Sequence, residues 1–307
     1  MPINIHNTVG DSTKTEMISK KQIWTYVGIM FFVSWTIQLL AIKITGGVNS
    51  EKMVFWLAGL MLTPLIVSFI FISRYKTFKE KLFWKPNINI LITSFFAVLV
   101  PILIAFAVLF FVQYFGYGKS DWFSFSTTSV SVNGGPLFLG RGEQPWVIFV
   151  LNVFLTGAAF ALLNSLFASG EEFAWRGMLQ PLLTDKYGLI KGITILGILW
   201  AMWHLPILLA GYNYPETPIL GALILFPIRL IAVSFFYAWL TIKSRSFIPA
   251  AIAHGALNGI QTGIISSIKM NSPQMFQDIT TMTVEILLGV FFLLLIVRTP
   301  KTKSPTY

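Results

Sequence analysis

Eight long apolar runs constrain this sequence more than any other feature. Each has at least the roughly 17 residues that an α-helix needs to cross the hydrocarbon core of a bilayer. Inside lipid only helices and closed barrels satisfy their own backbone hydrogen bonds. The sequence therefore predicts an all-α fold, a polytopic membrane bundle of about eight transmembrane helices. The predicted spans are 23–42, 53–73, 88–115, 146–184, 189–210, 219–242, 247–268 and 281–297.

Composition excludes a soluble domain. Of the 307 residues, 55% are hydrophobic and 11% are charged, whereas soluble domains carry about 25% charged residues. The first apolar run is too long for a signal-peptide core and no small-residue cleavage site follows it, so we expect an uncleaved first span. The sequence contains no cysteine, which excludes disulfides, thiolate metal ligands and a cysteine nucleophile.

We divide the chain into four parts by hydropathy and polar character. They are a cytoplasmic tail (1–22), the first transmembrane helices with an external loop (23–145), a core that holds the candidate site (146–270), and the last transmembrane helix with a cytoplasmic tail (271–307). The segment 116–145 is rich in Ser, Thr and Gly and is expected to be a long external loop. No internal repeat is evident, which argues against an inverted-repeat transporter.

Lys and Arg are distributed unevenly between the two ends of the predicted spans. Fifteen of the 22 lie at the end that carries both termini, five lie at the opposite end, and Arg176 and Arg229 lie within spans. The positive-inside rule therefore predicts that both termini are cytoplasmic, in what we expect to be a bacterial plasma membrane. This orientation accounts for the net charge of +10, so membrane lipid is an expected partner and nucleic acid is not.

Two adjacent carboxylates and an arginine lie within the fourth run, in the segment 170–177, Gly-Glu-Glu-Phe-Ala-Trp-Arg-Gly. A charged side chain at the bilayer centre costs roughly 2.5–3.5 kcal/mol on insertion scales, so such groups need partners or a function. Glu172 and Arg176 are four residues apart with the acid first, the better order for an ion pair on a helix. Glu171 projects about 100° away. We expect Arg176 to pair with Glu172 and Glu171 to remain free to act as a base.

Polar groups from two further spans reach a similar depth. His204 lies in the fifth span, while His254 and Asn258, four residues apart, share one face of the seventh. If the fourth helix continues to about residue 184, Glu171, His204 and Asn258 each lie about 20 Å from the cytoplasmic ends of their helices, and His254 lies about 14 Å from its end. One shared site explains this common depth better than three unrelated interhelical hydrogen bonds.

Three other features favour structural interpretations. A straight fourth helix would be nearly 60 Å long, too long for one span, so we expect a break near Thr156-Gly157 or a strong tilt. Arg229 and Glu285 lie at similar depth and are expected to form an ion pair. Small residues at every fourth position predict a closely packed helix face in the seventh span. These residues are Ala251, Gly255, Gly259 and Gly263.

The residues leave two chemical arrangements open. In the first, Glu171 takes a proton from a water that His204 helps to hold, while His254 and Asn258 donate hydrogen bonds to the developing oxyanion. In the second, Glu171, His204 and His254 bind Zn²⁺ and leave one position open for water. No Ser or Cys nucleophile motif accompanies the histidines. Both arrangements lead to hydrolysis by an activated water.

Three motifs in this region resemble those of the CPBP intramembrane proteases. They are Glu-Glu-x-x-x-Arg at 171–176, aromatic-x-x-x-His at 200–204 and His-x-x-x-Asn at 254–258, and they occur in the family's order within about residues 145–270. This family includes the type II CAAX prenyl endopeptidases and bacterial bacteriocin-processing or self-immunity proteins. Trp200 stands where the prenyl proteases usually carry Phe, so the resemblance leaves the substrate open.

The resemblance implies an eight-helix intramembrane endopeptidase that acts on a peptide or a membrane-anchored protein. In such an enzyme Glu171 and His204 activate water, and His254 with Asn258 stabilises the oxyanion. Glu172 and Arg176 support the site. Family members are often described as metalloproteases, which agrees with the zinc arrangement above.

Two hypotheses without proteolysis remain open at this point. A non-catalytic membrane partner or immunity protein would keep the same polar cluster for packing or binding. A transporter would use the cluster as a proton or ion site, although the absence of a visible repeat disfavours it.

Overall fold

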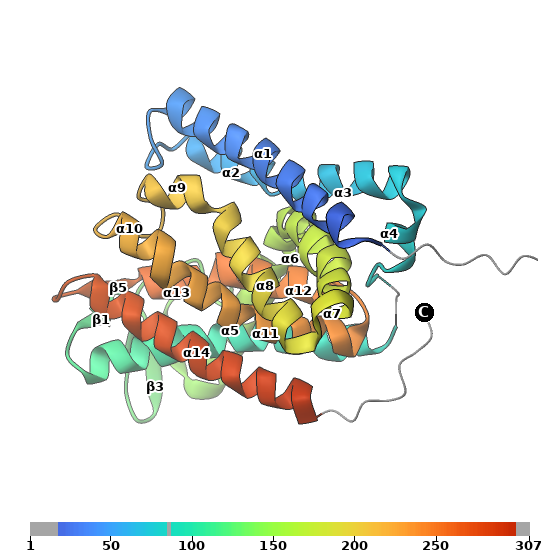
Figure 1. Ribbon diagram of the computed structural model, residues 1–307. Coiled ribbons are helices and arrows are strands. Elements are labelled where there is room, and N and C mark those ends of the chain that lie inside the picture. The colour runs from blue at the N-terminus through green and yellow to red at the C-terminus, as the bar shows by residue number, and fades with distance from the viewer. Residues whose placement is uncertain (1–17, 85–86, 299–307) are drawn as a thin grey trace, which may run out of the picture.

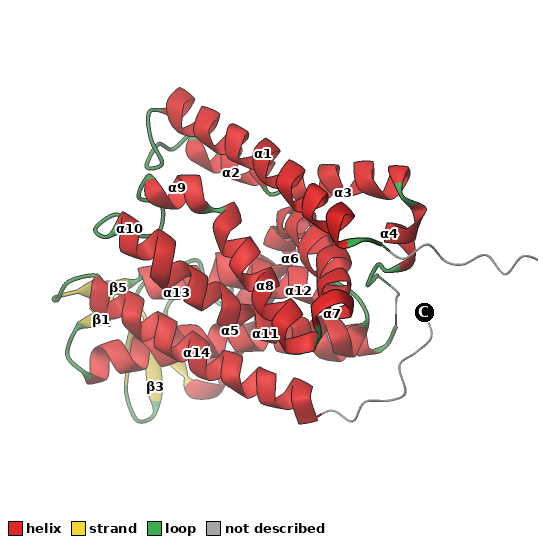
Figure 2. Cartoon of the chain, in the orientation of Figure 1, coloured by secondary structure: helices red, strands yellow, loops and turns green. Residues whose placement is uncertain are grey.

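The computed structural model describes residues 18–84 and 87–298 and shows a bundle of helices with very little sheet (Figures 1 and 2). Within these residues six helices are long and apolar enough to cross a membrane. They are Lys20–Thr45, Met53–Arg74, Asn89–Tyr114, Trp146–Tyr187, Pro218–Ser244 and Met275–Arg298. The predicted all-α membrane fold is confirmed. Lys14, Lys85, Lys301 and Lys303, which contribute to the predicted orientation, lie outside the described residues.

Three of the six long helices are single elements, and π-helical segments or turns divide the other three. In chain order they are α1 (Lys20–Thr45), α2 (Met53–Leu60) with α3 (Thr63–Arg74), α5 (Asn89–Tyr114), α6 (Trp146–Glu172) with η1 (Phe173–Leu179) and α7 (Gln180–Tyr187), α10 (Pro218–Leu220) with η2 (Gly221–Leu225) and α11 (Phe226–Ser244), and α14 (Met275–Arg298). The remaining helical elements are α4 (Lys76–Glu80), α8 (Leu189–Trp203), α9 (Leu205–Leu209), α12 (Ile248–Ala256), η3 (Leu257–Gln261) and α13 (Thr262–Ser266).

The fifth predicted span is broken at His204. Helix α8 ends just before this residue and the short helix α9 follows it. Pro206 causes the break, because proline has no N–H for the carbonyl four residues earlier. Trp35 and Gln38 of α1 donate to carbonyl oxygens in the last turn of α8, at 3.1 and 2.8 Å. Helix α1 therefore satisfies the backbone groups that the break frees, and His204 lies at the junction.

The fourth predicted span is one continuous helix of 42 residues from Trp146 to Tyr187. The expected break near Thr156-Gly157 is wrong, since α6 runs through both residues without interruption. The irregular segment is instead η1, whose wider π-helical turns begin directly after Glu172. Such turns are rare and occur often at functional sites.

The segment 116–145 is more ordered than the predicted loop. Strands β2 (Phe123–Phe125), β3 (Ser129–Val132) and β4 (Gly142–Pro145) form an antiparallel sheet. A further strand, β1 (Gly118–Ser120), pairs with β5 (Ile268–Met270), which connects α13 to α14. The alternating Ser-Val sequence of β3 suits a half-buried strand, and both of its valines are buried. The short strands attach this segment to the helices.

Short helices and strands lie at the two ends of the bundle, and each end has a different set of them (Figure 1). Helices α1 to α3 cover one side of the bundle and α14 runs along the opposite side. Between them, α6 packs against α12, and α11 packs against α8 and α14. Elements α9, α10, β1 and β5 gather at the end where α14 begins, whereas α4 and α7 lie at the other end.

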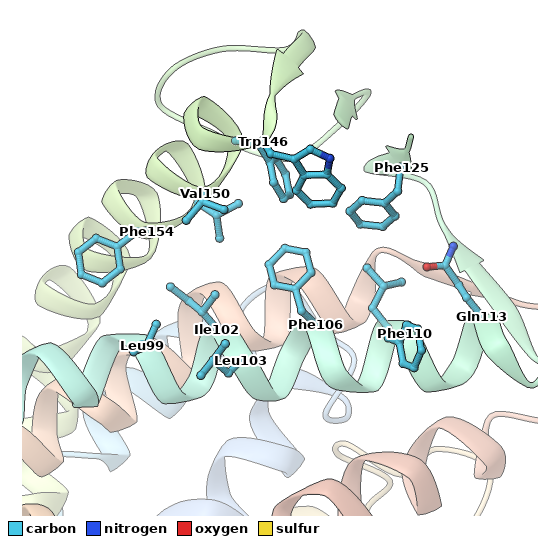
Figure 3. A pocket seen from close by; sticks show the side chains of 13 residues that line it. Leu99, Ile102, Leu103, Phe106, Phe110, Gln113, Phe125, Trp146, Val150 and Phe154 are labelled. Atoms are coloured by element: carbon cyan, nitrogen blue, oxygen red, sulfur yellow. The ribbon is translucent and has the colours of Figure 1, made fainter. Parts of the chain in front are cut away.

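An apolar cavity of about 540 Å³ lies between α5 and α6 (Figure 3). Leu103, Phe106 and Phe110 line it from α5, while Trp146 and Val150 line it from α6. Its lining contains no ionisable side chain. This cavity suits hydrocarbon, and it shares no residue with the polar cavity described below.

Glycines allow α6 to approach two neighbouring elements closely. A Cβ atom on Gly255 of α12 would meet the carbonyl oxygen of Ala161, and one on Gly259 would meet the Cβ atom of Phe160. A Cβ atom on Gly170 would meet the carbonyl oxygen of Met61, between α2 and α3. The prediction of a closely packed face on the seventh helix is therefore confirmed for Gly255 and Gly259, whose neighbour is α6, whereas Gly263 faces the ring of Trp122.

Replacement of Gly255 by alanine should destabilise the protein. The added methyl group overlaps backbone rather than a flexible side chain, and overpacking of this kind costs about 1–3 kcal/mol. Thermal unfolding in detergent should show a lower Tm for Gly255→Ala than for Gly28→Ala. At Gly28, in α1, a Cβ atom has open space around it. Equal Tm values for the two variants would contradict the packing described here.

Candidate active site

One polar cavity of about 890 Å³ brings together all four side chains to which the sequence gives a chemical role. Its lining includes Glu171 at the end of α6, His204 between α8 and α9, His254 on α12 and Asn258 in η3. The expectation that the fourth, fifth and seventh helices contribute polar groups to a common pocket is therefore met.

Glu171 lies in the wall of this cavity with only 2% of its surface exposed. Its Oε2 atom accepts a hydrogen bond of 2.9 Å from the indole Nε1 of Trp200. The ion pair with Arg176 involves the neighbouring Glu172, as the spacing predicts. The bond to Trp200 was not predicted, because it joins α6 to α8 across 29 positions.

The Glu172–Arg176 pair is fully buried beneath the cavity. Arg176 Nη1 lies 3.1 Å from the Glu172 carboxylate, and neither side chain is exposed to solvent. The guanidinium also donates to Ser234 Oγ at 3.2 Å. Its central carbon lies over the rings of Trp200 and Tyr237, 4.1 and 4.8 Å from their centroids. Aromatic faces stabilise a cation in such a position because their π-electrons carry negative charge.

His254 makes a contact that the sequence does not predict. Its Nδ1 atom lies 2.9 Å from Glu172 Oε1. An ionised carboxylate only accepts hydrogen bonds, so this contact assigns the proton to Nδ1 and leaves Nε2 for other partners. Glu172 therefore accepts hydrogen bonds from both Arg176 and His254. The second bond fixes the orientation of the imidazole ring.

His204 is oriented by the backbone of its own helix. Its Nδ1 atom lies 2.9 Å from the carbonyl oxygen of Trp200, so Nδ1 carries the hydrogen and Nε2 is the acceptor in the neutral ring. The ring also packs edge-on against Trp203 and Phe226, with centroids 4.7 and 5.1 Å away. These contacts leave the imidazole as a positioned acceptor in the cavity wall.

The zinc arrangement does not fit the geometry of these side chains. Within residues 18–84 and 87–298, no group of three or more His, Asp or Glu side chains is close enough to hold a metal ion. Glu171, His204 and His254 share the cavity without converging on one point.

The wall of the cavity includes a second ion pair. Arg229 of α11 donates from Nε and Nη2 to both carboxylate oxygens of Glu285, at 2.7 and 3.0 Å. Its Nη1 atom also donates to the hydroxyl oxygen of Tyr214 at 2.9 Å, and Gln261 donates to Glu285 at 3.1 Å. The predicted Arg229–Glu285 pair is confirmed. That it lines the same cavity as Glu171 was not predicted.

Several further polar groups in the cavity lie where the sequence placed loops. The last helix begins at Met275 rather than near residue 281, so Asp278 belongs to its first turn. Tyr212 and Glu216 come from the connection between α9 and α10. Burial, and to a lesser degree the Glu171 carboxylate, raises the pKa of Tyr212, so its phenol is neutral at pH 7. In the sequence these residues could be recognised only as members of polar connections between two predicted spans.

Comparison with known proteins agrees with this geometry. Residues 142–260 match the family model described as type II CAAX prenyl endopeptidase Rce1-like. A curated relative, CAAX prenyl protease 2 of Methanococcus maripaludis, is 28% identical over 220 residues, which are 67% of this chain and 70% of the relative. Over the part of the chain that carries the site, it is therefore similar to the type II CAAX prenyl endopeptidases of the CPBP family. These similarities and the apolar helices support a membrane-embedded peptidase.

The part of this protein that matches the family model contains most of the site. This part contains the candidate base, the two histidines and polar side chains around them, namely Glu171, Glu172, Arg176, Trp200, His204, His254 and Asn258. Gln261, Asp278 and Glu285 follow it in the chain, although they line the same cavity. Part of the cavity lining therefore comes from residues 142–260, and part comes from residues that follow them in the chain.

Loss of the Arg176 guanidinium should destabilise the peptidase strongly. The variant Arg176→Met leaves the Glu172 carboxylate buried with one partner fewer, and breaking a buried pair in this way costs about 3–5 kcal/mol. Unfolding in detergent should show this loss. The control Lys269→Met removes the exposed 3.5 Å pair with Asp121, for which a change of less than about 1 kcal/mol is expected. Similar losses in the two variants would contradict a structural role of the buried pair.

Proposed function

We propose that this CPBP-family peptidase hydrolyses peptide bonds of a peptide or membrane-anchored protein with a water that Glu171 and His204 activate. The observation that supports this proposal is that both side chains line one cavity together with His254 and Asn258. The carboxylate of Glu171, the imidazole acceptor of His204 and the donors of His254 and Asn258 therefore surround a space that can hold a water and a carbonyl group. Hydrolysis by an activated water needs these groups and no nucleophilic side chain.

The reaction begins with water between Glu171 and His204. The indole of Trp200 holds one oxygen of the Glu171 carboxylate, which leaves Oε1 to take a proton from the water. Nε2 of His204 accepts a hydrogen bond from the same water. The water oxygen then attacks the carbonyl carbon, and the carbonyl π-electrons move to its oxygen. A carboxylate that acts as general base in this way contributes roughly 10²–10⁴-fold to the rate.

The resulting oxyanion lies beside His254 and Asn258. Glu172 orients His254 through Nδ1, and when the ring is protonated its Nε2–H can donate to the oxyanion. The amide of Asn258 supplies a second donor. Donors fixed before the reaction stabilise such charge strongly in a water-poor cavity. Glu171 then returns the proton to the leaving amine nitrogen, the carbon–nitrogen bond breaks, and a carboxylic acid and an amine are formed.

Substitution of Glu171 by glutamine tests this mechanism. Purified Glu171→Gln should cleave a peptide that the wild type cleaves at a rate at least roughly 100-fold lower, because the amide cannot accept the proton. Its thermal unfolding should be close to that of the wild type. The control Glu143→Gln alters an exposed carboxylate in β4 and should keep full activity. Undiminished cleavage by Glu171→Gln would exclude Glu171 as the base.

The same samples separate the other hypotheses. Stoichiometric zinc in the purified wild type, together with loss of cleavage on chelation and recovery with zinc alone, would support the zinc arrangement. If Glu171→Gln keeps the cellular phenotype of the wild type, the protein acts as a partner or immunity protein rather than through proteolysis.

We also propose that both termini face the cytoplasm. The proposal rests on the sequence, in which fifteen basic residues flank the predicted spans on the side of the termini and five flank them on the other side. The natural chain has no cysteine, so each introduced cysteine is a unique label. A membrane-impermeant maleimide should label Thr127→Cys, in the β2–β3 connection, in intact cells. It should label Lys79→Cys only after permeabilisation. The reverse pattern would show the opposite orientation.

A further inference from the structure

The polar cavity carries an excess of negative charge. Four carboxylates line it, whereas Arg229 is the arginine or lysine of the lining among the described side chains, beside the two histidines His204 and His254. The carboxylates belong to Glu171, Glu216, Asp278 and Glu285. Both oxygens of Glu285 bind the guanidinium of Arg229, and His254 binds Glu172. The guanidinium of Arg229 is therefore already paired within the cavity wall.

Glu216 and Asp278 remain without such a partner. Among the described residues, no basic side chain lies within ion-pair distance of either carboxylate. Glu216 is exposed in the connection between α9 and α10, and Asp278 is half-buried in the first turn of α14. Asp278 is near enough for its charge to interact with Arg229 and, more weakly, with Glu216, although Arg229 is beyond ion-pair distance. Glu216 lies just before α10 and Asp278 lies in the first turn of α14, and these two helices begin at the same end of the bundle (Figure 1).

Two buried polar atoms in the lining also lack a partner in the protein. They are the carbonyl oxygen Oε1 of Gln261 and the indole Nε1 of Trp203, on side chains that are 2% and 1% exposed. Buried donors and acceptors are nearly always hydrogen-bonded, and each one left unpaired costs about 1–3 kcal/mol. Both side chains line the cavity. The ionisable side chains of the same lining, including Glu216 and Asp278, suit a polar ligand better than a hydrocarbon chain.

We infer that the substrate of this peptidase carries a basic residue near the scissile bond, and that Glu216 and Asp278 bind its side chain. The inference rests on the proposed function, because it assigns the specificity of the same cavity. Unmatched carboxylates attract a cation and repel an anion, and the apolar surroundings of the cavity strengthen both effects. Glu216 and Asp278 are thus specificity-determining residues at the end of the cavity away from α4 and α7.

Paired peptides that differ only in charge test the inference. The probes are quenched fluorescent peptides of alanine and leucine with one lysine placed at each position in turn, and the same peptides with acetyl-lysine. The wild type should cleave the best lysine peptide with a kcat/KM roughly tenfold higher than its acetylated form, equivalent to about 1.4 kcal/mol. This ratio should fall to about one in Glu216→Gln/Asp278→Asn. The control Glu143→Gln should keep the tenfold ratio.

A charge reversal provides the second variant. Glu216→Lys changes an exposed position, so it should fold as the wild type does, and it should favour glutamate peptides over lysine peptides. A ratio of one in the wild type, or an unchanged ratio in Glu216→Gln/Asp278→Asn, would overturn the inference.

Binding separates a failure of the inference from a failure of the proposed function. Fluorescence polarisation with Glu171→Gln measures the affinity for each peptide without turnover. If no peptide is cleaved but lysine peptides bind roughly tenfold more tightly than acetylated ones, the specificity stands and the proposed function fails. Equal binding of the two forms would overturn the specificity whatever the cleavage assay shows.

Discussion

The buried carboxylate of Glu172 is the group on which the arrangement of this site depends. A carboxylate taken out of water is strongly destabilising unless charged or hydrogen-bonding partners surround it. Arg176 meets it from the same helix and His254 meets it from α12. The helices that carry these three side chains can therefore pack in only a narrow range of positions. Glycines at the contact of α6 with α12 provide the close approach that the bond to His254 needs.

Aromatic rings connect this buried pair to the surface of the cavity. Trp200 stacks on the Arg176 guanidinium with its ring face and donates its indole N–H to Glu171. Two successive residues of one helix thus have different surroundings, since Glu172 is enclosed by partners while Glu171 borders the cavity. A phenylalanine at position 200 would keep the stacking but not the hydrogen bond. Trp200 therefore gives this chain a means of positioning Glu171 that a phenylalanine lacks.

Departures from regular helix decide which polar groups reach the cavity. The π-helical segment η1 follows Glu172, η3 contains Asn258, and His204 occupies a break before Pro206. The pattern of apolar residues does not reveal π-helical turns, because one extra residue in a turn leaves a long hydrophobic run unchanged. Pro206 was a visible signal for the break, but the satisfaction of the freed carbonyls by Trp35 and Gln38 depends on α1.

The sequence by itself determined the membrane class of the fold, the approximate spans, and the Glu172–Arg176 pair. The thickness of a bilayer sets the length of an apolar run, and a spacing of four residues sets a pair within one helix, so both are local properties. Equal depth also predicted the Arg229–Glu285 pair. Only the tertiary structure decided that Trp200 binds Glu171 and that His254 binds Glu172, across 29 and 82 positions. Such contacts depend on how the helices are rotated and packed, which hydrophobic spacing leaves undetermined.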